Sequence, residues 1–232
     1  MIYVTGDTHG YIDFDKLQRF AEENKQLTRR DYVIIAGDFG GVWYRKTLEE
    51  DLKYYKELPF TVLFVDGNHE NFDLLNEFPV EEWNGGKVHI VAENIIHLMR
   101  GQVFNIEGKT FFTFGGATST DKYMRVPGKE WWPQEVPSDA DIVEANKNLE
   151  RVGFKVDYII THEPPASLKD CLRVDTMQRL EIHAFFEDLT QDCQFKQWYF
   201  GKCHLNRYVP VRYFAVFDDI IPLKDTGGRG EA

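Results

Sequence analysis

The chain has 232 residues, 43% of them hydrophobic and 28% charged, a balance typical of a globular protein with a sizeable core and not of a disordered one. Its net charge of −11 offers no overall basic field for a long nucleic acid, although bound metal ions could still create a local nucleotide site. No apolar run reaches the ~20 residues that a membrane-spanning helix needs, so we expect no membrane partner.

Residues 1–80 repeat one pattern, in which a short apolar run is followed by a turn with glycine and then by an amphipathic stretch. The apolar runs, rich in β-branched and aromatic residues, predict strands at Ile2–Thr5, Tyr32–Ala36 and Phe60–Val65. Helical spacing follows them around residues 17–21, 47–58 and 72–75. This alternation predicts β-α units and a largely parallel inner sheet.

The middle of the chain predicts short strands, with residues 107–109 as a hairpin turn. These strands are His97–Met99, Gln102–Ile106 and Thr110–Phe114. A loop rich in Gly, Pro and Trp covers 115–137, and Ser138 or Asp139 is placed to cap a helix over 140–151.

The last third predicts a strand at Val156–Ile160, a helix near 177–190, a strand at Gln197–Phe200 and antiparallel segments within 207–222. Without a linker or a repeat, residues 1–224 are interpreted as one α/β domain with two mixed sheets. Residues 225–232 are interpreted as a flexible C-terminal tail.

Polar residues follow five of these predicted strands, at the ends where α/β folds usually bind ligands. They are Asp7 and His9, Asp38, Asn68 and His69, His162, and His204. Each alone has a simpler explanation, because Asp commonly forms a turn or caps a helix and Gly-Asn is a turn signal. Five independent turns would not be expected to supply oxygen and imidazole donors so consistently. The remaining histidines, at 89, 97 and 183, receive no role.

Carboxylate, carboxamide and imidazole donors suit divalent ions, and the lack of a thiolate among them argues against a closed structural zinc site. A carboxylate shared by two ions can hold them ~3.5–4 Å apart with a water or hydroxide between them. We therefore expect two divalent ions, with Mn favoured over Fe, Zn, Ni or Mg.

The order GDTHG, GDFGG, GNHE, a histidine after a strand and G-x-x-H, between residues 6 and 204, resembles the calcineurin-like metallophosphoesterase superfamily. The resemblance implies a four-layer α/β/β/α sandwich with a dinuclear metal site at its strand ends. It implies that one ion is held by Asp7, His9 and His204, the second by Asn68 and His162, and that Asp38 bridges them. It also implies that His69 is catalytic, assisting the leaving oxygen while a metal-bound hydroxide attacks phosphorus.

Lys202 departs from the family pattern, because it stands where the first histidine of a Gly-His-x-His motif usually completes the second metal site. Three explanations are open. The second site is weakened, or Lys202 replaces part of the ion's charge and contacts a phosphate oxygen. In the third, hydrolysis has been lost and the protein only binds a nucleotide or phosphate ligand.

A second departure lies after the second strand, where Gly41 and Val42 occupy the aspartate and arginine positions of the family's serine/threonine phosphatases. Arg125 in the loop 115–137 is therefore a candidate phosphate contact, with a solvated loop cation as the alternative. The aromatic residues of that loop, including Trp131 and Trp132, either form a wall over the site or pack the loop onto the sandwich.

The cysteines Cys171, Cys193 and Cys203 lack CxxC spacing, and the N-terminus shows no signal-peptide pattern. These features predict reduced thiols and a cytoplasmic location. The resulting expectation is a metal-dependent phosphatase or phosphodiesterase acting on a small phosphoester or a phosphoprotein. Its rivals are a catalytically silent binder, a nuclease of the same superfamily and an α/β protein whose motifs are only turns.

Overall fold

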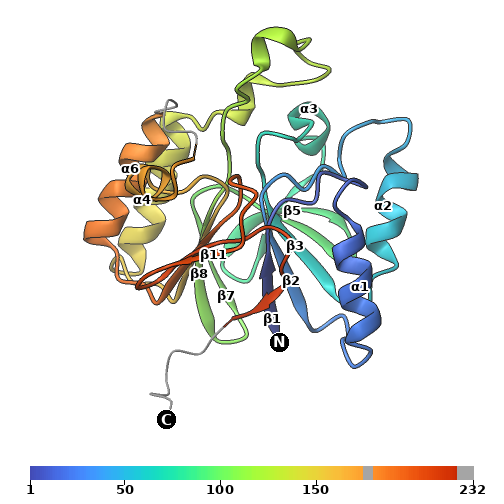
Figure 1. Cartoon of the computed structure of the whole chain (residues 1–232), viewed down its shortest axis with the longest axis horizontal. Coiled ribbons are helices and arrows are strands. Elements are labelled where there is room, and N and C mark those ends of the chain that lie inside the picture. The colour runs from blue at the N-terminus through green and yellow to red at the C-terminus, as the bar shows by residue number, and fades with distance from the viewer. Residues whose placement is uncertain (175–179, 224–232) are drawn as a thin grey trace.

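The computed structural model describes residues 1–174 and 180–223, and these contain two mixed β-sheets with helices on their outer faces (Figure 1). In order across it, the first sheet comprises β13 (Ile221–Pro222), β1 (Ile2–Thr5), β2 (Tyr32–Ala36), β3 (Thr61–Val65), β6 (Ile95–Leu98), β5 (Gly86–Ala92) and β4 (Val80–Trp83). The second comprises β11 (Arg207–Val209), β12 (Tyr213–Ala215), β10 (Gln197–Phe200), β9 (Tyr158–Thr161), β8 (Lys109–Phe114) and β7 (Gln102–Ile106). The predicted α/β fold with two mixed sheets is confirmed.

The central strands of both sheets run parallel and in close register. Thr5 pairs with Ile35 between β1 and β2, and Ala36 pairs with Val65 between β2 and β3. In the second sheet, Phe200 of β10 pairs with Thr161 of β9. Because parallel strands end at the same edge, the segments that follow β1, β2, β3, β9 and β10 are brought to one side of the molecule.

Helices cover the two outer faces, which makes the predicted four layers (Figure 1). Those beside the first sheet are α1 (Asp15–Glu23) and α2 (Leu48–Lys56), with the short α3 (Phe72–Leu75) after β3. Those beside the second sheet are α4 (Asp139–Arg151), α5 (Ala166–Leu172) and α6 (Glu181–Asp192). Three buried hydrophobic clusters fill the interfaces between layers, with Leu17 and Val33 in the first, Val4 and Tyr158 between the sheets, and Phe186 and Trp198 in the third.

The structure adds elements that the sequence analysis did not predict. The hairpin of β4 and β5 turns at Asn84 and Gly85, both at positive φ, which is the geometry that favours Asn-Gly in a two-residue turn. Its first strand, VEEW, is mostly exposed at the sheet edge and therefore lacks an apolar pattern. The predicted helix near 177–190 is seen as α6, while residues 177–179 and the predicted tail 225–232 lie outside the described residues.

One further feature agrees with the sequence. Ser138 caps α4 in a reciprocal capping box with Asp141, as its position before the helix suggested. Among the helices in residues 1–174 and 180–223, none has both the length and the apolar character that crossing a membrane requires.

A buried ion pair joins the end of β3 to the loop 115–137. The Asp66 carboxylate is buried and accepts hydrogen bonds from Nε and Nη2 of Arg100, at 2.9 and 2.6 Å, while Arg100 also donates to the backbone oxygens of Gln134 and Glu135. Burial alone would raise the pKa of Asp66, but Arg100 and His97 lower it below its ordinary value. The pair thus holds the loop against the strand end that precedes Asn68.

We expect Arg100→Met to destabilise the protein by about 3–5 kcal/mol, because it leaves the Asp66 charge buried without its partner. Urea unfolding measures this cost. Because the folded-state pKa of Asp66 is lowered, the pair stabilises the protein above about pH 4, and this stabilisation is lost in stronger acid. The difference in unfolding free energy between the unmodified protein and Arg100→Met should therefore shrink in stronger acid. Arg45→Met is the control, because the Arg45–Glu77 pair is exposed and screened by solvent, so its loss should cost much less. A cost no larger for Arg100→Met than for Arg45→Met would contradict the prediction.

Candidate metal centre

Donor atoms from five separated segments meet at the strand ends. Three overlapping groups have ligand atoms that all lie within 4.8 Å of one another: Asp7, His9 and His204; His9, Asp38 and His69; and Asp7, Asp38 and His162. The segments follow β1, β2, β3, β9 and β10, so both sheets contribute. The convergence expected from the sequence is therefore present.

Asp7 is fully buried, and its Oδ2 has no hydrogen-bond partner within the described residues. That oxygen nevertheless lies 2.9 Å from Nε2 of His204. Its other oxygen accepts a 3.2 Å hydrogen bond from the backbone N–H of Lys202. A buried carboxylate oxygen without a donor is costly, and a cation between it and the imidazole would satisfy both.

Asp38 lies at the middle of the cluster and is 2% exposed. Its Oδ2 is 3.4 Å from Nε2 of His9, and its Oδ1 is 3.4 Å from Nε2 of His162. Burial alone would raise the pKa of Asp38, but His162 and His9 lower it well below its ordinary value. One oxygen therefore faces each imidazole, and the group carries its negative charge.

Glycine is required beside this carboxylate. A Cβ at Gly67 would lie 2.0 Å from Oδ1 of Asp38, and a Cβ at Gly37 would lie 2.0 Å from Nδ1 of His162. Both positions lack room for any side chain, which explains two of the glycines in the GD and GN motifs.

The imidazoles are oriented by partners on their far nitrogens. Nδ1 of His9 lies 2.8 Å from Oδ2 of Asp13, and Nδ1 of His162 lies 2.9 Å from the backbone oxygen of Ala36. These contacts turn both Nε2 atoms toward Asp38, as partners of metal-binding histidines commonly do. The His204 ring stacks on Phe217 with centroids 4.5 Å apart.

The carboxylates also change the proton affinity of these rings. Although burial opposes it, Asp38 and Asp7 raise the pKa of His162 to about 9. The pKa of His9 is raised as well, against the effect of its burial, by Asp38 and Asp7. The negative potential that favours a proton here also favours a cation, so protons and metal would compete for these nitrogens.

The Lys202 side chain contacts Asn68, a predicted metal ligand. Its ammonium donates a 2.5 Å hydrogen bond to Oδ1 of Asn68, and that oxygen is 3.4 Å from Nε2 of His162. The amide Nδ2 of Asn68 donates to Oγ of Ser119, at 3.3 Å, and Ser119 donates in turn to the buried carboxylate of Glu135. Ser119 and Glu135 therefore hold the carboxamide so that its oxygen faces Lys202.

His69 lies beside these groups, with its ring 5.3 Å from that of His9 and 6.3 Å from that of Trp43. Burial, followed by the positive charge of His9 and Arg125, lowers the pKa of His69 despite the opposing effect of Asp38. Its backbone N–H donates to Oδ1 of Asp38 at 2.8 Å. This hydrogen bond ties the GNHE segment to the centre of the cluster.

The loop 115–137 contributes less to the site than its aromatic residues suggested. Arg125 pairs with Asp121 at 2.8 Å and donates to the backbone oxygen of Glu130, although it is close enough to affect the pKa of His69. Trp132 is buried, donates to Asp73 and packs edge-on against Trp43. For Trp132, the packing explanation is the correct one.

Several supporting residues were missed by the sequence analysis: Asp13, Lys16, Glu70, Ser119 and Glu135. Glu70 accepts hydrogen bonds from the backbone N–H groups of Phe39 and Gly40, and Lys16 donates to the backbone oxygens of Gly6 and Asp7. Burial lowers the pKa of Lys16 to about 8. Asp13 and Glu70 could have been found, because one follows His9 by four residues and the other belongs to GNHE.

Comparison with known proteins found a matching family model, curated relatives and a solved structure of similar length. The family model for calcineurin-like phosphoesterases matches residues 1–201. A lariat debranching enzyme from Schizosaccharomyces pombe is 31% identical over 137 residues, which cover 53% of this chain and 27% of that protein. A lariat debranching enzyme from Danio rerio is 25% identical over 190 residues, which cover 72% of this chain and 31% of that protein. The chain thus spans about a third or less of the length of these curated relatives. A phosphopantetheinyl hydrolase from Mycobacterium tuberculosis aligns over 94% of this chain and 89% of its own, with a TM-score of 0.45 and 16% identity.

Proposed function

Because this chain belongs to the calcineurin-like phosphoesterase family, we propose that it is a metal-dependent hydrolase of small phosphomonoesters or phosphodiesters. The observation that supports this most strongly is the buried Asp38 carboxylate, which presents one oxygen to His9 and the other to His162. A buried carboxylate between two imidazoles has the donor types that a borderline divalent cation prefers.

The residues fit a metal, since Oδ2 of Asp7 is buried beside His204 without a hydrogen bond. Asp7, His9 and His204 would hold one ion together with Asp38, while Asn68 and His162 are the candidates for a second. A divalent cation bound there would neutralise charge on the phosphoryl oxygens and lower the pKa of water at the site. Mn is the ion to test first, with Fe, Zn, Ni and Mg as alternatives.

The protein's own groups then have separate tasks. His69, at the edge of the cluster beside His9, would donate an imidazole proton to the leaving oxygen. Lys202 would place a fixed positive charge beside Asn68, where phosphoryl oxygens approach. Arg125 is held by Asp121, so we assign it an indirect effect on charge near His69 and not the main phosphate contact.

We further propose that Lys202 weakens the second metal position, so that the protein holds one tight divalent ion. The ammonium occupies the Asn68 oxygen that a second ion would need. Replacing Lys202 with histidine should then raise the number of tightly bound Mn ions from one to two, as counted by equilibrium titration and elemental analysis.

Lys53→His is the matched control, because the Lys53 side chain is 70% exposed and belongs to α2, away from the cluster. The Lys53→His substitution should leave the number of tightly bound Mn ions at one. Two equally tight sites in the unmodified protein would show that Lys202 does not weaken the second position.

Turnover of chromogenic phosphomonoesters and phosphodiesters, assayed with Mn, Ni and Mg, tests the proposed activity. A chelator should abolish turnover, and added Mn should restore it. Lys202 also favours a second candidate, a catalytically silent protein that binds a nucleotide or phosphate ligand. That candidate would be supported by phosphate binding without turnover under any of these ions.

The proposed substrate class follows from the net charge of the chain and from the small share of each relative that it covers. The lariat debranching activity named for the relatives is not proposed for this chain, because the matches cover a third or less of those proteins. A net charge of −11 weighs against a long nucleic acid, so we propose a small phosphoester, with a phosphoprotein as the alternative. The cytoplasm is proposed as the location on the spacing of the three cysteines.

A further inference from the structure

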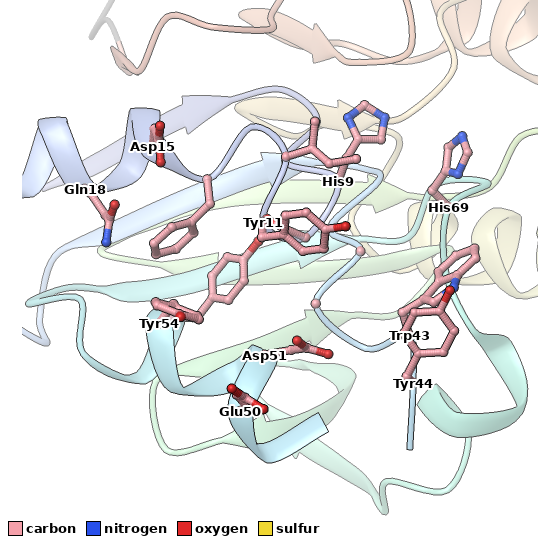
Figure 2. A pocket seen from close by; sticks show the side chains of 16 residues that line it. His9, Tyr11, Asp15, Gln18, Trp43, Tyr44, Glu50, Asp51, Tyr54 and His69 are labelled. Atoms are coloured by element: carbon pink, nitrogen blue, oxygen red, sulfur yellow. The ribbon is translucent and has the colours of Figure 1, made fainter. Parts of the chain in front are cut away.

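A groove of about 640 Å³ opens beside His9 and His69 and runs between α1 and α2 (Figure 2). Its size lies within the range of sites for small organic ligands. Six of its lining residues carry aromatic rings: Tyr11, Phe14, Trp43, Tyr44, Tyr54 and Tyr55. Asn68, His162 and Lys202 are not among its lining residues, so the groove adjoins the His69 side of the metal cluster.

The aromatic rings of the groove fall into two groups. Phe14 and Tyr55 are buried, and the Tyr55 hydroxyl donates to the backbone oxygen of Gly10, so these two rings belong to the fold. Tyr11, Tyr44 and Tyr54 are 82%, 61% and 49% exposed. Large exposed rings gathered at one hollow are unusual on a surface unless they contact a ligand.

The two sides of the metal cluster differ in the charge of the residues around them. Within the described residues the groove is lined by no lysine or arginine, while Asp15, Glu50 and Asp51 bring carboxylates to it. On the side away from the groove, the Lys202 ammonium donates a hydrogen bond to Asn68. A phosphoryl group would favour the cationic side, whereas an anion in the groove would be repelled.

We propose that this groove binds the leaving group of the substrate, and that this group is an uncharged alcohol carrying an aromatic ring about the size of a nucleobase. The inference rests on the proposed function, because it places the scissile oxygen at His69. Water adds to phosphorus and releases a proton to solvent, the P–O bond to the alcohol breaks, and the alcohol oxygen takes the proton of His69, which solvent then replaces. The ring of the alcohol stacks on Tyr44, which lies beside Trp43 and near His69, and its lack of negative charge matches the carboxylates.

Three esters with primary alcohols of similar leaving ability test the preference: 2-(2-naphthyl)ethyl, ethyl and 2-sulfoethyl, each as the monoester and as the methyl diester. We expect kcat/KM for the naphthyl ester to exceed that for the ethyl ester by about tenfold, the effect of one stacked ring. The sulfoethyl ester should be the poorest. Equal kcat/KM for the naphthyl and ethyl esters would overturn the inference.

Substitutions in the groove test whether the preference for the naphthyl ester arises there. Tyr44→Ala should lower the naphthyl-to-ethyl ratio by about threefold or more, whereas Tyr44→Phe should preserve it because the ring remains. Tyr123→Ala is the matched control, since Tyr123 is 90% exposed but does not line the groove. Glu50→Lys should raise kcat/KM for the sulfoethyl ester by about threefold or more at low salt, and the gain should shrink as salt is added. A ratio that falls as much in Tyr123→Ala as in Tyr44→Ala would contradict the assignment.

A binding measurement separates this inference from the proposed function. The free alcohol 2-(2-naphthyl)ethanol is fluorescent, so its anisotropy reports binding without turnover. It should bind the unmodified protein more tightly than the Tyr44→Ala variant. Equal binding to the two proteins would overturn the groove assignment whatever the turnover. Weaker binding by Tyr44→Ala, without hydrolysis of any ester, would support the aromatic site and refute the hydrolase.

Discussion

Replacing Asp38 with asparagine is expected to remove tight binding of the divalent ion and to lower kcat/KM by at least about 10³-fold. Asp38 is the carboxylate that faces both His9 and His162, so its replacement removes the negative charge between them and puts an amide NH2, which cannot bind a cation, in place of one oxygen. Metal ions typically supply several kcal/mol to phosphoryl transfer, and each 1.36 kcal/mol corresponds to a factor of ten in rate. Elemental analysis and Mn titration would be measured beside the rate.

Asp157→Asn is the control for this prediction. Asp157 is a partly buried aspartate that accepts hydrogen bonds from Thr110 and directly precedes β9, at the end opposite the one that leads to His162. Its replacement should affect unfolding in urea and leave the metal content unchanged. If Asp38→Asn retained both its metal and its turnover, the proposed centre would be wrong.

His69→Ala is expected to lower kcat for alkyl esters by about 10²–10⁴-fold while leaving the metal content unchanged. A proton donor matters most when the leaving alcohol is a poor one, so the loss should be much smaller for a 4-nitrophenyl ester. Rates with both esters, measured at saturating Mn, give the comparison. This dependence on the leaving group separates proton donation from a general effect on folding.

His89→Gln provides the control for His69→Ala. His89 is a buried histidine whose Nδ1 lies 3.0 Å from Nδ1 of His97 in the first sheet, away from the cluster of ligands. It should leave the ratio between alkyl and 4-nitrophenyl esters unchanged. An equal loss for both esters in His69→Ala, or a loss of metal, would assign His69 to the metal site and not to the leaving group.

The two departures from the family pattern have different consequences. Lys202 is integrated into the cluster, because its ammonium and its backbone N–H contact Asn68 and Asp7. Gly41 and Val42, by contrast, leave the site without a carboxylate and a guanidinium in those positions. Gly41 lines the groove, but a Cβ there would meet the buried rings of Phe39 and Tyr55, and the Val42 side chain is buried in the core.

The amino-acid sequence alone determined most of the framework. The bounds of β1, β2, β7 and β10 agree with those predicted, because each is a short apolar run bounded by turn residues. The candidate ligands also followed from the sequence, since residues after parallel strands must gather at one sheet edge. The hairpin of β4 and β5 was missed because its exposed edge strand carries charges in place of an apolar pattern.

Only the tertiary structure decided how the site is supported and what flanks it. Ser119 and Glu135 orient Asn68 across more than 50 residues of sequence, and Arg125 is engaged by Asp121 instead of facing the cluster freely. The groove likewise combines segments after β1 and β2 with α2. Apolar periodicity reports which face of an element is buried, but the direction of a polar side chain depends on the partners that packing brings to it. Those partners are distant in the chain, and they decide the chemistry next to His69.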